Sequence, residues 1–533
     1  MLKPEDVHYL EVQRLHLQTK LDASKTQEER NRLGQFATPP ALAIEILERA
    51  SMLLEGDRKQ IHFLDPAFGT GAFYSALLKV FPTASIQAHG YDIDTHYGNP
   101  AQRLWRDTPL ILTLGDFTQA TPPQTEAERV NLLICNPPYV RHHHLPPAEK
   151  IQLQTRVQHM INIHLSGLTG LYGYFLLLGH AWLREGGLAG WLIPAEFMDV
   201  NYGVQLKHYL TTQVRLIEIQ RFDTSISQFE DALVSSALVW FRKEHPSPHQ
   251  EVSLRSGGTV SKPEIIKNVA LSQLKPTIKW AALFTASHRS NPASSQRAPK
   301  IKLIDLFTIK RGIATGANRF FILTPEKISR YEIPHKFLQP ILPSPRYIPS
   351  DEIEADQIGN PKLARRLFLL VCDQPEDRIR DRWPMLWAYL ETGIQQGIHK
   401  RYLCRHRSPW YAQEHRPSAP FLFPYMGRRN ANGDLPFRFI LNHSKATAPN
   451  VYLMLYPKPT LAKAIQQHSA LLESIWRGLN SISDEILLKQ GRVYGGGLHK
   501  LEPCELANTS AERLAAYLPE SVVNAPQQLP LFT

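Results

Sequence analysis

Residues 130–139 read Val-Asn-Leu-Leu-Ile-Cys-Asn-Pro-Pro-Tyr, a short and mainly apolar run that ends in an amide, two prolines and an aromatic ring. The run is too short for a surface helix and is typical of a buried strand in a parallel sheet. Proline has no N–H group for the strand ladder and fixes φ, so the strand must end before Pro137. Asn136 is therefore expected at the carboxyl end of a strand, which is where ligands bind in open α/β sheets.

The chemistry of this ending suits a planar amine. A rigid Pro-Pro turn would present the carboxamide oxygen of Asn136 beside the carbonyl of Pro137, and both oxygens can accept hydrogen bonds from one exocyclic amino group. Tyr139 offers a flat face on which a base can stack. These four residues resemble the Asn-Pro-Pro-Tyr signature of amino-methyltransferases, although an ordinary strand-to-loop turn can have the same sequence.

Three more short strands are expected upstream, and an acidic residue lies at the end of each. Residues 61–65 end in Asp65 and continue into a glycine-containing turn, residues 86–93 contain Asp92 near their end, and residues 110–114 are followed by Asp116. Glycines let a backbone approach a ligand closely, and an acid at the end of the second strand is placed to hold ribose hydroxyls. Any one acid alone is better explained as a solvated loop carboxylate, but four strand ends with polar groups predict a shared site.

The order of these motifs resembles the S-adenosylmethionine-dependent DNA adenine-N6 methyltransferases of restriction-modification systems. Within them it is most similar to the gamma class, typified by the TaqI methyltransferase, in which the cofactor motifs precede catalysis and a target recognition domain comes last. The motifs are Thr-Pro-Pro at 38–40, Asp-Pro-Ala-Phe-Gly-Thr-Gly-Ala-Phe at 65–73, Tyr-Asp-Ile-Asp at 91–94, Gly-Asp-Phe at 115–117 and the Asn-Pro-Pro-Tyr segment.

This resemblance implies a set of site residues. Asn136, Pro137 and Tyr139 would hold the target base, and Phe229 would pack on its opposite face. Without the resemblance, Phe229 is equally well explained as a hydrophobic plug at the sheet edge. Asp65 stands where some members have Glu, which shortens the reach of the carboxylate. The residues that would contact S-adenosylmethionine are Thr38, Asp65, Ala67, Gly69, Gly71, Asp92, Ile93, Asp116 and Phe117.

A chain of 533 residues exceeds one typical hydrophobic core and predicts several domains. The expected organisation is an N-terminal helical extension over 1–30, a catalytic domain over 31–243, a linker region over 244–300 and a target recognition domain over 301–533. The catalytic domain should be α/β, with a Rossmann-like class I methyltransferase sheet whose last strand is antiparallel, and the recognition domain should be mixed α/β. Within the catalytic domain, the sequence of residues 171–183 predicts a buried helix that Gly186 and Gly187 end.

The net charge of +11 favours a polyanionic partner, and the resemblance implies double-stranded DNA. Residues 400–445 interleave arginines with aromatic residues, a pattern that suits phosphate contacts but also fits a solvated charged face. The candidate DNA-binding residues are Arg405, Arg407, Arg428 and Arg429.

The four cysteines are scattered without metal-ligand spacing, so neither zinc nor disulfides are expected. No stretch approaches a membrane span and no secretory signal is visible, which predicts a cytoplasmic protein, and we expect a monomer. Residues 57–59 read Asp-Arg-Lys, which matches the Asp-x-Lys pattern of many nuclease sites, but they lie in the turn before the first strand, which is poorly placed for such a site. A restriction endonuclease for the same DNA site would therefore be a separate chain. The alternatives are an RNA or protein-glutamine methyltransferase and a non-catalytic DNA-recognition subunit.

Overall fold

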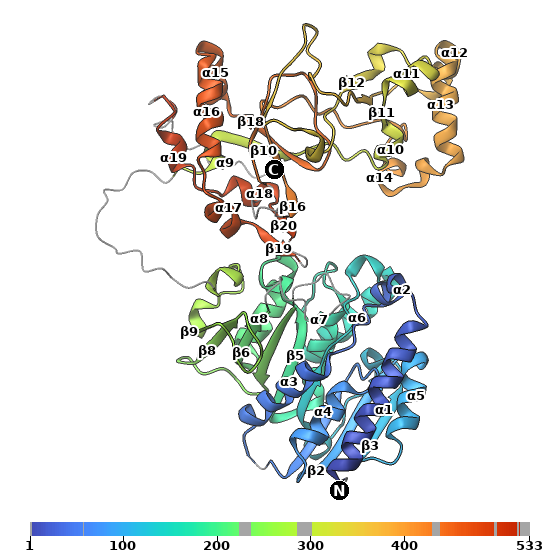
Figure 1. Cartoon of the computed structure of the whole chain (residues 1–533), viewed down its shortest axis with the longest axis vertical. Coiled ribbons are helices and arrows are strands. Elements are labelled where there is room, and N and C mark those ends of the chain that lie inside the picture. The colour runs from blue at the N-terminus through green and yellow to red at the C-terminus, as the bar shows by residue number, and fades with distance from the viewer. Residues whose placement is uncertain are drawn as a thin grey trace. The chain divides into compact units, whose positions relative to one another are not determined.

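The computed structural model describes residues 3–56, 58–222, 236–284, 301–428, 437–494, 498–519 and 522. The chain divides into two compact units (Figure 1). The first comprises residues 1–291 with 494–497, and the second comprises residues 292–493 with 498–533.

The described part of the first unit contains a nine-stranded sheet in the order β3-β2-β1-β4-β5-β7-β6-β8-β9. Strands β1 to β5 pair in parallel, and β7 runs antiparallel to both β5 and β6. This confirms the predicted α/β class I methyltransferase sheet with an antiparallel strand near its end. The strands are β1 Gln60–Asp65, β2 Ser85–Asp92, β3 Leu110–Leu114, β4 Val130–Cys135, β5 Leu183–Pro194, β6 Arg215–Arg221, β7 Ser236–Arg242, β8 Glu251–Ser256 and β9 Ile265–Ala270.

Helices cover both faces of this sheet, so alternate residues of its central strands enter two different cores (Figure 1). Leu132 and Ile134 of β4 pack on the side of α3 and α4, whereas Leu133 and Cys135 pack on the side of α6, α7 and α8. All six residues of β4 are buried, as expected for a central parallel strand. The helices are α1 Pro4–Ala23, α2 Gln27–Leu33, α3 Pro40–Leu53, α4 Ala72–Val80, α5 Thr95–Trp105, α6 Pro147–Ile161, α7 Leu171–Gly179 and α8 Val204–Thr212.

The strand order reverses between β1 and β4, because β2 and β3 lie on one side of β1 while β5 follows β4 on the other. In open parallel sheets the crevice outside the carboxyl ends of the strands at such a switch point is the usual ligand site. Asp65 and Asn136 stand at these two strand ends.

The helix over residues 171–183 was predicted to end at Gly186 and Gly187, and this boundary is wrong. Helix α7 ends at Gly179, a short 3-10 turn follows, and the two later glycines lie inside β5. The pairing of β4 with β5 is irregular there, since Val130 pairs with Leu183 and Leu132 with Leu188. Gly186 adopts a φ of +73°, so these glycines serve an irregular strand rather than a helix end.

The predicted linker over 244–300 is also wrong for the part of it that the structure describes as sheet. Strand β8 pairs parallel to β6, and β9 pairs antiparallel to β8. The side chain of Glu218 on β6 is fully buried and binds Arg255 of β8 at 2.8 Å and Arg49 of α3 at 2.5 Å. A buried carboxylate needs such partners, so these strands belong to the first unit.

The second unit is mixed α/β, as predicted, and its largest described sheet has the order β10-β18-β15-β17-β13. Two three-stranded sheets have the orders β11-β14-β12 and β16-β20-β19. Its strands are β10 Phe307–Arg311, β11 Ile322–Leu323, β12 Leu338–Pro340, β13 Glu352–Ile353, β14 Phe368–Leu370, β15 Phe421–Pro424, β16 Met426–Arg428, β17 Ile440–Asn442, β18 Tyr452–Pro457, β19 Arg492–Tyr494 and β20 Leu498–Lys500.

The second unit also contains helices. Among the described residues of the whole chain, none of the helices has the length and apolar character of a membrane span. The helices of the second unit are α9 Leu303–Leu306, α10 Asn318–Phe321, α11 Pro325–Arg330, α12 Glu376–Arg382, α13 Pro384–Gln395, α14 Tyr402–Arg405, α15 Pro459–Gln467, α16 Ala470–Asn480, α17 Asp484–Gln490, α18 Pro503–Ala507 and α19 Glu512–Ala515.

Candidate active site

A cavity of about 530 Å³ lies at the carboxyl ends of β1, β2, β3 and β4. Residues from the turn after each of these strands form its wall, together with the segment before α3. Of the nine residues predicted to contact the cofactor, eight line this cavity, namely Thr38, Asp65, Ala67, Gly69, Asp92, Ile93, Asp116 and Phe117.

The ninth, Gly71, shapes the turn after β1 from behind. It adopts a φ of +92°, and an added Cβ would lie 2.7 Å from both the Phe68 ring and the Trp105 indole nitrogen. That indole donates a hydrogen bond to the carbonyl of Thr70 at 2.9 Å. Only glycine fits a position with this φ and these neighbours, so the turn can close tightly over the end of β1.

Asp65 is a nearly fully buried carboxyl at the end of β1, only 1% exposed. Its Oδ1 accepts a hydrogen bond from the backbone N–H of Ala67 at 3.1 Å. Burial, together with repulsion from the carboxylate of Asp92, raises the pKa of Asp65 to about 8, although the hydrogen bond from Ala67 opposes this rise. A carboxyl in this state gains most from a cation placed beside it, because a cation compensates for the lost solvation of the charged form.

Asp92 connects two turns of the site. Its Oδ2 accepts from the N–H of Gly69 at 2.7 Å, and its Oδ1 accepts from the N–H of Asp94 at 2.8 Å. A carboxylate has about four acceptor positions, so these bonds leave capacity for hydroxyl groups in the cavity. Burial raises the pKa of Asp92 to about 6, although the two backbone hydrogen bonds oppose this rise.

The third strand end provides an apolar wall. Phe117 is buried, with its ring centre 5.4 Å from that of Phe175 and 5.5 Å from that of Trp182. Asp116 caps the 3-10 turn over 117–119 by accepting from the N–H and the hydroxyl of Thr118 at 2.8 and 2.7 Å. Ile93, 71% exposed, gives the cavity a second apolar surface near its mouth.

The side chain of Asn136 is oriented by the segment before α3. Its Nδ2 donates to the carbonyl of Phe36 at 3.0 Å and to the hydroxyl of Thr38 at 3.2 Å. Because a carbonyl can only accept, the amide nitrogen must face Phe36 and the oxygen must face away from it. Within the described residues this buried Oδ1 has no hydrogen-bond partner. An unsatisfied buried acceptor is costly, and here it lies at a cavity that a donor can enter.

Two other residues of the Asn-Pro-Pro-Tyr turn lie behind the cavity wall. Pro137 and Tyr139 are buried and are not among the lining residues, whereas Pro138 and Val140 are. The Tyr139 hydroxyl donates to the carbonyl of Leu192 at 3.1 Å, and its ring centre lies 5.8 Å from that of Phe36. The flat face that was expected to stack on a base is therefore not on the cavity wall in this structure.

The N-terminal extension provides cavity residues that the sequence analysis missed. Gln18, Asp22 and Lys25 line the cavity, although they precede every recognised motif. Gln35 and Phe36 line it as well, and their position just before Thr38 was the one available signal for them. Phe229, the predicted second face of the base pocket, lies outside the described residues.

The predicted DNA-binding arginines have different surroundings. Arg407 donates to the carbonyls of Ala314 and Thr315 at 2.7 and 2.9 Å, so it holds a loop of its own unit. Arg405 is exposed, with its guanidinium 5.3 Å from the centre of the Tyr402 ring. Arg428 is exposed at the end of β16, and Arg429 lies outside the described residues.

The loop that Arg407 holds forms part of a second cavity of about 930 Å³ in the same unit. Among the described residues that line it there are four cations and no acid. The cations are Arg319, Lys327, Arg330 and Arg401.

Two protein families match the chain in separate parts. Residues 92–229 match the Eco57I restriction-modification methylase family, and residues 277–527 match the C-terminal domain of the type II methyltransferase M.Eco57I. Both matches are to restriction-modification methylases, and they support the resemblance of this chain to the gamma-class type II DNA methyltransferases. The chain is 25% identical over 498 residues to the type II methyltransferase M.AccI of Acinetobacter calcoaceticus. The alignment covers 90% of this chain and 85% of the relative.

A second relative of this methyltransferase is the type II methyltransferase M.XamI of Xanthomonas campestris pv. amaranthicola. It is 26% identical over 453 residues, with 83% of this chain and 79% of the relative covered. Among solved structures, the type IIL restriction-modification enzyme MmeI in complex with DNA aligns with a TM-score of 0.55 and 12% identity. That alignment covers 88% of this chain and 66% of MmeI, and it shows a shared fold.

Proposed function

We propose that this DNA methyltransferase transfers a methyl group from S-adenosylmethionine to N6 of an adenine extruded from double-stranded DNA. The observation that carries the proposal is the Oδ1 of Asn136, a buried acceptor without a partner in the described residues, at the same cavity as Asp65 and Asp92. This acceptor suits a substrate N–H donor, and an exocyclic amino group on a planar ring is such a donor.

The residues of the cavity fit S-adenosylmethionine. The buried carboxyl of Asp65 would hold the ammonium of its amino acid part, which compensates for the burial of that carboxyl. Asp92 has free acceptor positions for the ribose hydroxyls, and the apolar surfaces of Ile93 and Phe117 would enclose the adenine ring. When bound, this cofactor supplies an electrophilic methyl group on a sulfonium.

Asn136 would orient and polarise the target amine. Its Oδ1 accepts one N–H of the adenine amino group, and the carbonyl of Pro137 is proposed to accept the other. These bonds draw the nitrogen lone pair out of conjugation with the ring and point it toward the cofactor. The base must leave the duplex to reach this position, because the stack shields its amino group. Phe229 is proposed to pack on the second face of the extruded base.

We also propose where this methyltransferase contacts the DNA backbone. The second cavity, which lies in the second unit and is lined by four cations, suits phosphodiester groups. Since Arg407 holds one wall of this cavity, its proposed role is to shape the DNA surface rather than to touch DNA. We propose that the enzyme acts as a monomer in the cytoplasm, alongside a separate restriction endonuclease for the same site.

The test is the modified base itself. The protein is produced in a host that lacks its own DNA methylases, and the digested host DNA is analysed by mass spectrometry against unmodified standards. N6-methyladenine is expected, and its amount should fall sharply when the Asn136→Ala variant is produced instead. The appearance of N4-methylcytosine, or of methylated RNA or protein with unmodified DNA, would contradict the proposal.

A further inference from the structure

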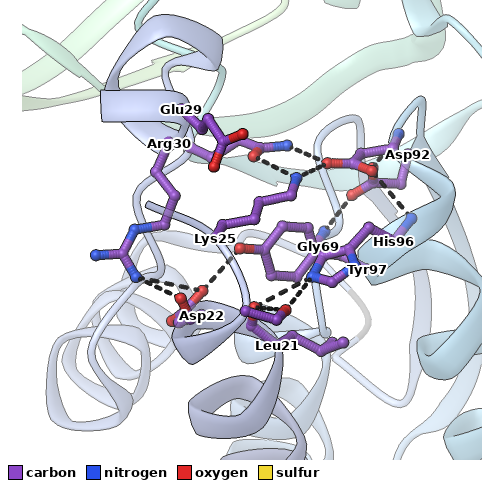
Figure 2. A network of polar contacts seen from close by, with 12 residues as sticks. Leu21, Asp22, Lys25, Glu29, Arg30, Gly69, Asp92, His96 and Tyr97 are labelled. Carbon is purple, nitrogen blue, oxygen red and sulfur yellow. Dashed lines mark hydrogen bonds and ion pairs between the residues drawn. The ribbon is translucent and has the colours of Figure 1, made fainter. Parts of the chain in front are cut away.

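The turn between α1 and α2 is bonded to the acidic turn after β2 (Figure 2). The ammonium of Lys25 donates to Asp94 Oδ2 at 2.5 Å and to Gln35 Oε1 at 3.1 Å. Gln35 Nε2 donates to the same oxygen of Asp94 at 2.7 Å. Lys25 thus joins three parts of the cavity wall that are far apart in the sequence: the N-terminal extension, the segment before α3 and the turn that holds Asp92.

Further polar contacts hold the extension in the residues that precede Lys25. The Tyr97 hydroxyl donates to Asp22 Oδ1 at 2.8 Å, and the ring nitrogen of His96 donates to the carbonyl of Leu21 at 3.1 Å. One helical turn earlier, the hydroxyl of Thr70 in the glycine turn donates to Gln18 Oε1 at 2.6 Å. The extension is therefore bonded to two of the three turns that the proposed function assigns to the cofactor.

The two acids of the β2 turn have different functions in this network. Asp94 accepts from Lys25, from Gln35 and, through its Oδ1, from the N–H of His96 at 2.9 Å. Asp92 accepts only from backbone N–H groups among the described residues, and one of these belongs to Asp94. Asp94 is thus occupied by the protein, whereas Asp92 keeps acceptor capacity for a ligand, and the position of one acid depends on the other.

On these contacts, and on the proposed cofactor, we propose that Lys25 is a positioning residue for S-adenosylmethionine binding. By holding Asp94 it places the turn that carries Asp92, so the N-terminal extension completes the cofactor site. The positive charge of Lys25 supports the same role, because it favours the ionised form of Asp92. Burial is the main cause that raises the pKa of Asp92, the neighbouring carboxylate of Asp94 adds to this, and the ammonium of Lys25 opposes both. Without Lys25 the Asp92 carboxylate would be both misplaced and harder to ionise.

The test compares Lys25→Met, Lys25→Arg and the matched control Lys20→Met in the full-length protein. Lys20 is an exposed lysine in the last turn of α1, the helix that precedes Lys25, so it controls for the loss of one positive charge. Calorimetric titration with S-adenosylmethionine should show that Lys25→Met weakens binding about tenfold, as expected for loss of a charge-assisted contact. Lys25→Arg should recover most of the affinity, and Lys20→Met should match wild type.

Kinetics separate a positioning role from a merely structural one. Lys25→Met should raise the KM for S-adenosylmethionine about tenfold, while kcat at saturating cofactor and the affinity for DNA stay within about twofold of wild type. The double variant Lys25→Met with Asp94→Asn should bind the cofactor no more weakly than the weaker single variant, because both changes break one contact.

Several outcomes would overturn the inference. Unchanged cofactor affinity in Lys25→Met would do so. Parallel losses of kcat, DNA affinity and thermal stability would also do so, since they would indicate that Lys25 only stabilises the fold. Additive losses in the double variant would also do so. If the wild-type protein itself does not bind S-adenosylmethionine, the proposed function fails first, and that result is distinct from wild-type binding that Lys25→Met leaves unaltered.

Discussion

The amide of Asn136 is held at its nitrogen and is open at its oxygen. Replacing it in Asn136→Ala removes the acceptor for the target amine but no group that faces the cofactor. We expect the single-turnover rate of methyl transfer to fall by roughly two to three orders of magnitude, comparable to the loss of one oriented polar group from other active sites. Calorimetric affinity for S-adenosylmethionine should stay within about threefold of wild type. A variant that still methylates DNA at the wild-type rate would exclude Asn136 from the chemistry.

Asp65 makes the unliganded protein sensitive to pH. Its pKa is raised from an ordinary value of 3.8 to about 8, so between these values the folded state holds a proton that the unfolded state has released. Its contribution to stability therefore declines as pH rises from about 4 to 8, and this decline ends above the folded-state pKa.

Binding of the cofactor ammonium should have the opposite pH dependence, because it requires the ionised form of Asp65. We expect affinity for S-adenosylmethionine to increase by up to about tenfold per unit between pH 6 and pH 7.5, with a proton released on binding. In Asp65→Asn the affinity should be weaker and nearly independent of pH over this range. Calorimetry in two buffers of different ionisation enthalpy measures the released proton directly. A wild-type affinity that is flat with pH would contradict this assignment.

Among the elements, the segment before α3 is in contact with the catalytic turn along its backbone. Gly34 adopts a φ of +65°, and its carbonyl accepts from the N–H of Tyr139 at 3.1 Å. An added Cβ would lie 2.4 Å from that nitrogen. Gly34→Ala should therefore move the segment away from Asn136 and lower both cofactor affinity and methyl transfer by at least tenfold, since backbone atoms cannot yield as side chains do.

The matched control for this substitution is Gly56→Ala. Gly56 has a similar φ of +82° but no atom within 4 Å of the added Cβ. It should show only the cost of the left-handed backbone, about 1 kcal/mol in urea unfolding, with normal activity. Equal loss of activity in both variants would attribute the effect of Gly34→Ala to general instability.

Strand β8 is attached to the sheet by the buried carboxylate of Glu218. Glu218→Gln would leave Arg255 beside a neutral partner and weaken the contact with Arg49, so we expect a loss on the order of 3 kcal/mol in urea unfolding. Asp107→Asn, which breaks an ion pair that is mostly exposed, should leave the midpoint unchanged. An unchanged midpoint for Glu218→Gln would mean that the attachment of β8 is mainly apolar.

The elements that could be predicted from sequence are those whose ends are decided locally. Pro137 ends β4 whatever surrounds it, and the order of acids after β1, β2 and β3 predicted the cavity wall. The errors concern contacts made across the chain. Gly186 and Gly187 end a helix in isolation, but in the sheet they form an irregular strand opposite Val130 and Leu132. Lys25 has no local signal, because its partner Asp94 is 69 residues away.

At the scale of the whole molecule, the net charge of +11 favours DNA binding only where cations gather without neighbouring acids. If the second cavity holds phosphates, replacing Arg319, Arg330 and Arg401 together by alanine should reduce the slope of log affinity against log salt by about two to three units. The control removes Arg378, Arg380 and Arg382 of α12, which do not line that cavity. Equal slopes for the two triple variants would place the phosphate contacts elsewhere.

Thr38 and Phe36 line the proposed cofactor cavity and also hold the amide nitrogen of Asn136. A cofactor that orders this segment from the cavity side therefore also orders Asn136, the proposed acceptor for the target base. We expect binding of the two substrates to be cooperative, with S-adenosylmethionine entering first and an extruded adenine retaining it. Thermodynamic linkage then makes the effect mutual: the factor by which the cofactor tightens specific DNA equals the factor by which specific DNA tightens the cofactor.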